Sequence, residues 1–448
     1  MSRFGLLLSC LFRAASAPAA PALPALCRVG AIAARFRGET HGAVMIIFAI
    51  VLLPILLCVG AAVDYGLAAQ ARAKLNAAAD MAALAAVNKA ALTATAASAQ
   101  VSAVSAFNAQ TGGPARSGIT TVNATVTDNG LGRTAVVSYS SAVPTMFMGL
   151  AGVKTMTVTG SSSATSNLPA YIDFYLLLDN TPSMGIGATP ADVSTMVANT
   201  SDKCGFACHD LSDPTGNYYT LAKKLGVTMR IDVVRQATQQ LMDTATSSST
   251  VPNQFRAAIY TFGASCTQTG FTTITTLTAS LSSAKTAASA IDLMTIPNQG
   301  YNNDQCTDFN GTLAAVNLAI PAPGDGSTAA APQKVLFFVS DGVADAYYPS
   351  TCTRTTTGGR CQEPINAAGC TAIKNRGIKI AVLYTTYLPL PTNSWYNTWI
   401  SPFQSTIGTR MQSCASPGLY FEVSPTDGIA SAMSALFQKA VASGRLTQ

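Results

Sequence analysis

The chain has 448 residues, of which 48% are hydrophobic and only 11% are charged, and its formal net charge is +6. This length allows two or three domains with well-buried cores. Most of the positive charge lies in residues 1–42, which hold five arginines and one glutamate. The rest of the chain therefore has no basic stripe that would bind nucleic acid.

An apolar segment follows this basic tail. Residues 43–63, AVMIIFAIVLLPILLCVGAAV, carry no charge. As a helix they would span roughly 31 Å, which is the thickness of a bilayer core. Pro54 lies in the middle of the segment, and membrane helices tolerate proline there. The segment is therefore predicted to be a single transmembrane helix.

The charges around this segment predict its orientation. Three arginines lie between residues 28 and 37, and Asp64 follows the segment. Under the positive-inside rule the N-terminus stays in the cytoplasm, and the chain from Asp64 onward is exported. Residues 1–42 are then a disordered basic tail in the cytoplasm. The alternative is a cleaved signal peptide in MSRFGLLLSCLFRAASAPA, but its apolar stretch is short and Arg13 closes it.

Residues 64–169 are predicted to form a small α+β unit. The Ala-rich stretch has no Gly or Pro after Gly66, so one helix is expected to leave the bilayer and continue to about Gln110. Its Ala-rich face would pack against another helix, in this chain or in a partner, or only on its own unit. A DNG turn at 128–130 between two β-rich runs predicts a hairpin. KTMTVTGSSSATS predicts one more strand followed by a Ser/Thr linker.

From residue 170 strands alternate with helices. The expected strands are YIDFYLLLD, FRAAIYTFG, KVLFFVSDG, IKIAVLYTT and YFEVS, and IASAMSALFQKAVASG is the expected closing helix. This alternation predicts a doubly wound, mostly parallel α/β sheet over residues 170–442. Such sheets bind ligands at the carboxyl ends of their strands. Asp179 and Asp341 both lie at such ends.

Oxygen-bearing side chains gather at these two strand ends. Asp179, Thr181 and Ser183 alternate in DNTPS directly after the first strand, and Asp341 ends KVLFFVSDG. An extended loop with alternate spacing can point three oxygens in the same direction. Hydroxyls with one or two carboxylates are hard ligands, which suit Mg²⁺ or Mn²⁺ better than zinc. In the competing interpretation the two aspartates only cap the helices that follow.

This pattern resembles the metal-ion-dependent adhesion site of the von Willebrand factor type A family, Asp-x-Ser-x-Ser followed by a distant Thr and a distant Asp. Thr181 replaces the first Ser and keeps its hydroxyl. The distant Thr is best placed at Thr307 in CTDFNGTL, and Thr312 is the weaker candidate. The resemblance implies that Ser183, Thr181 and Thr307 bind Mg²⁺ or Mn²⁺ directly. Asp179 and Asp341 would act partly through water, and a carboxylate from a partner protein would take the open position.

The membrane half resembles the TadE/TadG-like family of Flp (Tad) pilus-assembly proteins. A basic, Gly-containing lead is followed by the membrane helix, then by DYG at 64–66 and by an Ala-rich helix with Asp80 and Leu84 in register. Pilin-like relatives that are processed carry Glu five residues after the cleaved Gly. Here Ile47 stands five residues after Gly42, so the helix is expected to remain as an anchor.

Eight cysteines lie in the exported part of the chain. They stand at positions 204, 208, 266, 306, 352, 361, 370 and 414. An even number of exported cysteines suits a disulfide framework in an oxidising space. In CGFACHD, Cys204 and Cys208 are predicted to form a local disulfide clasp. Two less favoured interpretations of the same run are attachment of a c-type haem and a zinc site that adds His209.

These features together predict a bitopic inner-membrane protein with a periplasmic binding domain. It would act in assembly or anchoring of a Tad pilus, binding other pilus-assembly membrane proteins or a carboxylate-bearing protein ligand through the metal site. The alternative is a surface adhesin that works without a pilus. No P-loop or zinc-protease helix is found and only two histidines are present, so enzyme activity is not expected.

Overall fold

The computed structural model describes residues 42–112, 120–298, 306–346, 352–355, 359–424 and 428–444. The predicted basic tail therefore lies outside the described residues, apart from its last residue. The chain divides into two compact units. One comprises Met1–Leu75, Gly112–Thr121 and Ser140–Gly160, and the other comprises Asn76–Thr111, Val122–Tyr139 and Ser161–Gln448.

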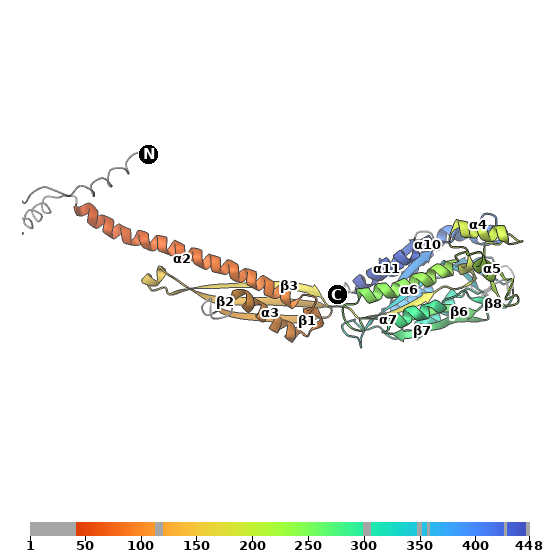
Figure 1. The fold of residues 1–448 in the computed structure, drawn as a ribbon, viewed down its shortest axis with the longest axis horizontal. Helices are drawn as coiled ribbons and strands as arrows, with labels where there is room; N and C mark the ends of the chain where they lie inside the picture. The colour runs from red at the N-terminus through yellow and green to blue at the C-terminus, as the bar shows by residue number, and fades with distance from the viewer. Residues whose placement is uncertain are drawn as a thin grey trace, which may run out of the picture. The chain divides into compact units, whose positions relative to one another are not determined.

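The first described element is a long helix, α2 (Gly42–Ala86), with Pro54 inside it (Figure 1). Its apolar half is long and apolar enough to cross a membrane, and only 6% of its most apolar window is buried within the chain. The Ala-rich half is different, because one stripe of it is fully buried. That stripe includes Ala79, Ala82 and Ala83, each 0% exposed. The Ala-rich face therefore packs within this chain.

The helix does not continue to Gln110 as predicted from the sequence. It ends at Ala86, a short 3₁₀ turn η1 (Ala91–Thr93) follows, and a second helix α3 (Ala96–Thr111) begins after it. The Asn88 side chain accepts a hydrogen bond from the Ala91 N–H at 2.8 Å, which offers the backbone an alternative to the helix. The buried guanidinium of Arg133 then donates to the carbonyl of Ala91 at 2.5 Å. Propensity alone could not reveal this long-range contact.

A three-stranded sheet follows these helices in the chain, with the strand order β1-β2-β3. The predicted hairpin is present: β1 (Thr120–Asn129) and β2 (Gly132–Pro144) flank Gly130, whose φ is +59°. The predicted Ser/Thr linker is wrong, because β3 (Thr155–Asn167) continues through it. Exposure alternates along β3, as expected of a strand with one face covered, and pairing with β2 satisfies its backbone.

The C-terminal part is a mixed α/β fold with an eight-stranded, mostly parallel sheet, which confirms the predicted fold class. The strand order is β13-β12-β9-β4-β6-β8-β5, and β7 pairs antiparallel with β6. The strands are β4 (Ile172–Leu178), β5 (His209–Asp210), β6 (Phe255–Ser265), β7 (Gln268–Thr278), β8 (Thr295–Ile296), β9 (Gln333–Ser340), β12 (Lys379–Thr385) and β13 (Tyr420–Val423).

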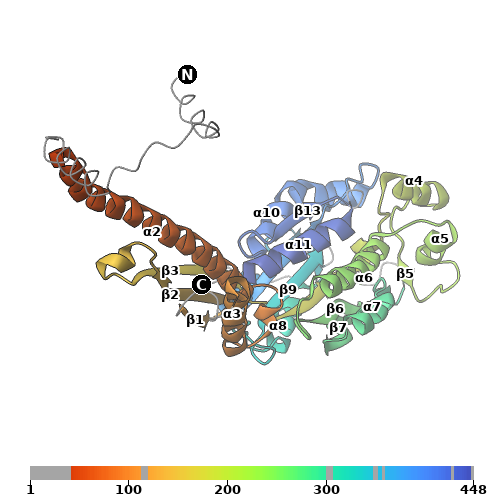
Figure 2. The same ribbon diagram turned by 60° about the vertical axis from the view of Figure 1, so that its left-hand side comes forward.

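Helices cover both faces of this sheet, and α6 and α11 lie side by side on one of them (Figure 2). A small hairpin of β10 (Val343–Ala346) and β11 (Cys361–Pro364) stands apart from the sheet. The helices are α4 (Pro190–Asn199), α5 (Tyr218–Lys224), α6 (Arg230–Ser248), α7 (Leu281–Ala287), α8 (Phe309–Ala319), α9 (Ala368–Asn375), α10 (Gln404–Cys414) and α11 (Ile429–Gly444). Short 3₁₀ and π turns are η2 (Met148–Ala151), η3 (Pro182–Gly185), η4 (Ala288–Ala290), η6 (Tyr396–Ile400) and η7 (Ser401–Phe403).

The central strand β4 is buried on both faces because its side chains alternate between two cores. Phe174 and Leu176 belong to the core that includes residues of α6 and α11, whereas Tyr175 and Leu177 belong to the core of α8, α9 and α10. A strand buried on both faces reads as a continuous apolar run, which is why YIDFYLLLD is recognisable in the sequence. In the parallel register Leu178 pairs with Val339, so the ends of β4 and β9 meet.

Candidate metal centre

Asp179 is the first residue after β4, and its side chain is 0% exposed. Its N–H continues the ladder by donating to the Val339 carbonyl at 2.9 Å. One carboxylate oxygen accepts from the Thr181 N–H at 3.0 Å and from the Thr181 hydroxyl at 2.7 Å. The other accepts from the Ser340 hydroxyl at 2.6 Å. The carboxylate is therefore fixed in one orientation at the edge of the sheet.

Asp341 lies one residue beyond β9 and is also 0% exposed. Its carboxylate accepts from the Val343 N–H at 3.2 Å, and the Ser183 side chain lies near enough to oppose the rise of its pKa. The chain turns sharply at Gly342, where φ is +75° and an added Cβ would lie 2.7 Å from Cγ2 of Ile407. Both the dihedral and the space therefore demand glycine, which explains the D-G pair.

The four predicted oxygen donors at these strand ends lie together. The Thr181 and Ser183 hydroxyls are 3.3 Å apart, the Thr181 hydroxyl donates to Asp179, and Ser183 lies near enough to Asp341 to act on its pKa. The turn that brings them together is η3, with Pro182 at its first position. Proline suits that position because its fixed φ matches the turn and its missing N–H is not needed there.

The cluster contains two carboxyl groups that burial makes costly to ionise. Burial raises the pKa of Asp179, as does the nearby charge of Asp341, while hydrogen bonds from Ser340 and Thr181 oppose the rise. Burial likewise raises the pKa of Asp341, against the attraction of Arg230. A buried carboxylate without enough positive charge nearby is costly. The pair therefore favours the approach of a cation.

A positively charged side chain, Arg230, already lies in this cluster, and it was not predicted from the sequence. Arg230, at the start of α6, is 0% exposed, and its guanidinium lies 3.4 Å from Asp341. It also donates to the Thr386 carbonyl at 3.0 Å. Two carboxyl groups therefore share one guanidinium, and because the pKa of each is raised, a proton or a second cation must complete the charge balance of the buried cluster. Nothing in the sequence around Arg230 marks this contact, because it joins residues 111 positions apart.

The two candidates for the distant threonine differ in their surroundings. Thr307 is 3% exposed and lines the same cavity as Ser183. Its backbone pairs with Asp345 through two hydrogen bonds of 2.8 and 3.0 Å. The Thr312 hydroxyl instead donates to the Gly270 carbonyl at 2.7 Å, within the packing of α8 against β7. The structure thus brings Thr307, and not Thr312, to the cavity beside Ser183.

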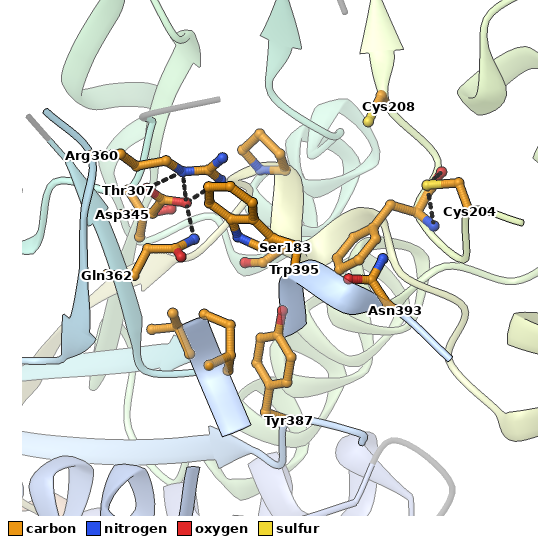
Figure 3. Close-up of a pocket in the computed structure, with 14 residues that line it drawn as sticks. Ser183, Cys204, Cys208, Thr307, Asp345, Arg360, Gln362, Tyr387, Asn393 and Trp395 are labelled. Carbon is orange, nitrogen blue, oxygen red and sulfur yellow. Dashed lines mark hydrogen bonds and ion pairs between the residues drawn. The ribbon is translucent and has the colours of Figure 1, made fainter. Parts of the chain in front are cut away.

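A cavity of about 290 Å³ opens beside these oxygens (Figure 3). Sequence reasoning did not find its polar lining, which is built on Asp345. Arg360 binds both oxygens of Asp345, and the Gln362 amide donates to it at 2.9 Å. The Trp395 ring lies 4.6 Å from the Arg360 guanidinium. Asp345 follows Asp341 by four residues, which is the one signal that could have drawn attention to it.

Two polar atoms of this lining are buried without a partner among the described residues. They are the Gln362 carbonyl oxygen, which can accept a hydrogen bond, and the Trp395 indole N–H, which can donate one. Gln362 is only 6% exposed, so water does not freely solvate its amide. Unpaired buried polar groups are rare and costly. The cavity is therefore suited to a ligand with one donor and one acceptor.

The structure corrects the predicted disulfide clasp between Cys204 and Cys208. Both residues are in the thiol form. Phe206 and Ala207 between them bridge to Ile186 and Gly185, which keeps this segment extended. An extended chain of four residues covers roughly 13 Å, too far for a disulfide. Figure 3 shows the two thiols well apart.

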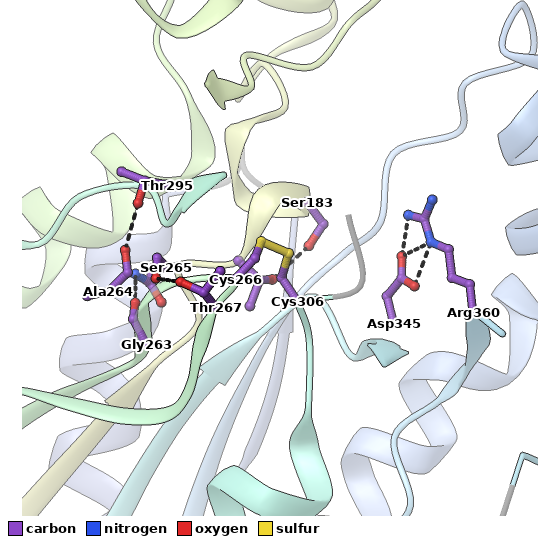
Figure 4. The surroundings of a disulfide bond; sticks show 12 residues. Ser183, Gly263, Ala264, Ser265, Cys266, Thr267, Thr295, Cys306, Asp345 and Arg360 are labelled. Carbon is purple, nitrogen blue, oxygen red and sulfur yellow. Dashed lines mark hydrogen bonds and ion pairs between the residues drawn. A yellow bond between two sulfur atoms is a disulfide. The ribbon is translucent and has the colours of Figure 1, made fainter. Parts of the chain in front are cut away.

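The described disulfides use the six cysteines that follow Cys208 in the chain. They are Cys266–Cys306, Cys352–Cys361 and Cys370–Cys414. The first joins the end of β6 to the residue before Thr307, and Figure 4 shows Ser183 among its surroundings. It therefore tethers the Thr307 loop at the edge of the sheet where Asp179 lies. Disulfides of this kind fit an oxidising compartment.

The zinc interpretation of CGFACHD finds no support in the geometry, and the haem interpretation stays a prediction. The His209 ring stacks on Tyr219 with centroids 4.0 Å apart, and its Nδ1 lies 3.3 Å from the Leu293 carbonyl. Cys204, Cys208 and His209 do not bring three ligand atoms within 4.8 Å of one another. This run is therefore part of the packing around β5 rather than a zinc ligand set.

One family description matches part of the chain. A sequence model of the Tad family, described as "Putative Flp pilus-assembly TadE/G-like", matches residues 42–105. The match covers all of α2 and the larger part of α3. No curated protein matches the chain.

Several solved structures are similar to the chain, at low identity. The vWF domain of the type V pili tip protein Mfa5 from Porphyromonas gingivalis matches 61% of this chain and 96% of its own, with 11% identity and a TM-score of 0.37. The pilus adhesin SpaC from Lactobacillus rhamnosus GG matches 72% and 34%, with 11% identity and a TM-score of 0.34. The PilB minor pilin from Streptococcus sanguinis matches 72% and 78%, with 11% identity and a TM-score of 0.33. Scores this low support no conclusion about function.

The side chains at the strand ends fit a hard divalent cation. The donor set consists of carboxylate and hydroxyl oxygens, which is the chemistry that Mg²⁺ and Mn²⁺ prefer. The buried cluster has two carboxyl groups to one guanidinium, and both carboxyl groups are held in place by neighbouring hydroxyls and N–H groups. Ser183 and Thr307 face the cavity, where an outside ligand can reach.

Proposed function

We propose that this protein is an inner-membrane-anchored component of Tad (Flp) pilus assembly or anchoring. Its periplasmic α/β domain would bind a carboxylate-bearing protein ligand through a von Willebrand type A metal site. The observation that carries the proposal is the convergence of Asp179 and Asp341, both fully buried, with the hydroxyls of Thr181 and Ser183.

The pilus and membrane parts of the proposal rest on the first third of the chain. The Tad family match over residues 42–105 includes the apolar segment of α2, which is long and apolar enough to span a membrane. Arginines before this segment and Asp64 after it favour a cytoplasmic N-terminus. Three disulfides in the C-terminal part favour an oxidising compartment such as the periplasm.

The cavity suggests what the ligand presents to the site. Thr181, Ser183 and Thr307 would hold Mg²⁺ or Mn²⁺ directly, Asp179 and Asp341 partly through water, and the metal would supply a positive charge for a ligand carboxylate. Beside the proposed metal position, the Gln362 carbonyl oxygen can accept a hydrogen bond from a ligand and the Trp395 N–H can donate one. A peptide amide offers both groups. We therefore propose a protein ligand in which a carboxylate lies next to a main-chain amide.

Binding rather than catalysis is proposed for this site. Within the described residues the one histidine, His209, is stacked on Tyr219 and is not part of the oxygen cluster. A nucleophile–base pair of the Ser-His kind therefore has no candidate at Ser183. The role proposed for the hydroxyls of this site is to bind a cation.

Metal binding is tested by comparing two threonine substitutions in the full chain. Thr307→Val is expected to weaken Mg²⁺ or Mn²⁺ affinity at least tenfold in calorimetric titrations, because a direct oxygen ligand is lost. Thr312→Val serves as the matched control. It removes a hydrogen bond to Gly270, which costs about 1 kcal/mol of stability, and it should leave the metal affinity unchanged. Equal, weak affinity in wild type and Thr307→Val would contradict the proposed site.

The role of the metal in partner binding is tested by a pull-down from detergent-solubilised membranes. Wild-type chain is expected to retain pilus-assembly proteins in Mg²⁺ and to release them in EDTA. Ser183→Ala should lose them in both buffers, whereas Ser194→Ala, on the exposed face of α4, should behave as wild type. Retention of the same proteins by wild type in EDTA would show that the partner does not bind through a metal.

A further inference from the structure

A short loop between β2 and β3 is exposed and apolar. Residues 145–153, TMFMGLAGV, are here called the apolar loop, and they carry no charge. Leu150 is 83% exposed, Met146 is 72% exposed, Phe147 is 43% exposed and Val153 is 41% exposed. Clustered large apolar side chains at the surface mark an interaction site.

The apolar loop is fixed to α2 by Asp64. The Asp64 carboxylate accepts hydrogen bonds from the N–H groups of Met146 at 2.8 Å, Phe147 at 2.9 Å and Met148 at 2.7 Å. Burial by itself raises the pKa of Asp64, but these three bonds hold the pKa below its usual value, so the carboxylate stays charged. The loop and this part of α2 also belong to the same compact unit.

A second contact sets the position of the loop along α2. An added Cβ at Gly60 would lie 2.4 Å from Cβ of Phe147, so the Phe147 side chain rests directly on the helix backbone. Gly60 lies within the apolar segment 43–63, three residues before its end, which is about 4.5 Å along the helix axis. Phe147 is therefore level with the last turn of the membrane-spanning segment.

Most backbone N–H groups of the apolar loop have hydrogen-bond acceptors within the protein, which suits the loop to an environment that contains little water. Besides the three N–H groups bound by Asp64, those of Leu150, Gly152 and Val153 donate to carbonyls within the loop. The Thr145 N–H donates to the Lys154 carbonyl at the base of the loop. Backbone groups that enter a membrane must be satisfied internally. The loop therefore avoids most of the cost of leaving water.

We propose that the apolar loop is a second membrane contact, which docks into the outer interface of the bilayer that α2 crosses. The proposal rests on α2 spanning that bilayer. Because Gly60 and Asp64 fix the loop at the level where the span ends, Met146 and Leu150 meet lipid headgroups and upper acyl chains. A helix that is anchored together with a loop resists rotation and tilt in the bilayer more than a single helix does.

The test uses the full chain in lipid vesicles that contain acyl chains brominated near the headgroup. Leu150→Trp adds a tryptophan at a site exposed enough to leave the fold unchanged. After subtraction of the wild-type signal from Trp395 and Trp399, its emission is expected to be blue-shifted and to be quenched by the brominated lipid. Alkaline carbonate extraction reports separately whether α2 is embedded.

The control is Val136→Trp, which lies on β2 roughly 26 Å along the strand from Pro144 and is 41% exposed. It should show water-like emission without lipid quenching. Gly60→Ile combined with Leu150→Trp should lose the quenching, because the new side chain displaces Phe147. Suppose that carbonate does not extract the chain and that Leu150→Trp is quenched no more than Val136→Trp. The apolar loop then does not dock into the bilayer, even if its emission is blue-shifted because a protein partner covers it. If carbonate does extract the chain, the proposal that α2 spans the bilayer is itself wrong.

Discussion

Arg230→Met is expected to destabilise the metal-free protein by about 3–5 kcal/mol, the usual cost of breaking a buried ion pair by removing one partner. The guanidinium is 0% exposed and faces Asp341 at 3.4 Å. Methionine keeps much of the side-chain length but carries no charge. Two buried carboxylates, Asp179 and Asp341, then remain without a compensating cation.

The same substitution is expected to make the protein respond more strongly to metal. If Mg²⁺ binds among the oxygens of Asp179 and Asp341, it supplies the positive charge that Arg230→Met removes, so part of the lost stability should return. Ligand binding to the folded state alone stabilises that state by mass action. Urea unfolding in EDTA and in saturating Mg²⁺ measures both effects.

Arg256→Met is the matched control for this experiment. Arg256 also pairs with a buried aspartate, Asp173, at 2.7 Å, but Asp173 keeps a second partner in Lys334. The control should therefore cost much less than Arg230→Met and should respond to Mg²⁺ as wild type does. Destabilisation of Arg230→Met by the same amount in EDTA and in Mg²⁺ would argue that no cation joins Asp179 and Asp341.

The sheet could be predicted from the sequence because its strands carry their own signal. A parallel strand covered on both faces is a continuous apolar run, and β4, β9 and β12 are such runs. Their order along the chain and the rule that parallel carboxyl ends share one edge bring Asp179 and Asp341 together. The closing helix IASAMSALFQKAVASG was also predicted with the bounds that α11 (Ile429–Gly444) has in the structure.

Features that depend on distant contacts could not be predicted in this way. The end of α2 at Ala86 depends on Arg133, and the charge balance at Asp341 depends on Arg230. β7 was missed because QTGFTTITTLT is rich in threonine, which also suits a loop. The Asp345–Arg360 pair needs the β10–β11 hairpin, whose two strands are too short to show a pattern. In each case the local sequence is compatible with more than one structure.

The second large effect is expected from loss of the Cys266–Cys306 disulfide. The two residues are 40 positions apart, and closing a loop of that size in the unfolded chain contributes about 4 kcal/mol in the chain-entropy model. The Cys266→Ala, Cys306→Ala double variant should lose stability by about this amount in urea unfolding. It should also bind Mg²⁺ or Mn²⁺ more weakly, because the tether of the neighbouring residue Thr307 is lost.

The Cys370→Ala, Cys414→Ala variant separates these two effects. This disulfide spans 44 positions and joins α9 to the last residue of α10, so the entropic loss is nearly the same. Neither cysteine adjoins an oxygen donor of the site, and the metal affinity of this variant should match that of wild type at a temperature where both are folded. If metal affinity fell equally in both double variants, the Cys266–Cys306 bond would contribute only to general stability. A fall confined to Cys266→Ala, Cys306→Ala would mean that the bond holds Thr307 at the cation.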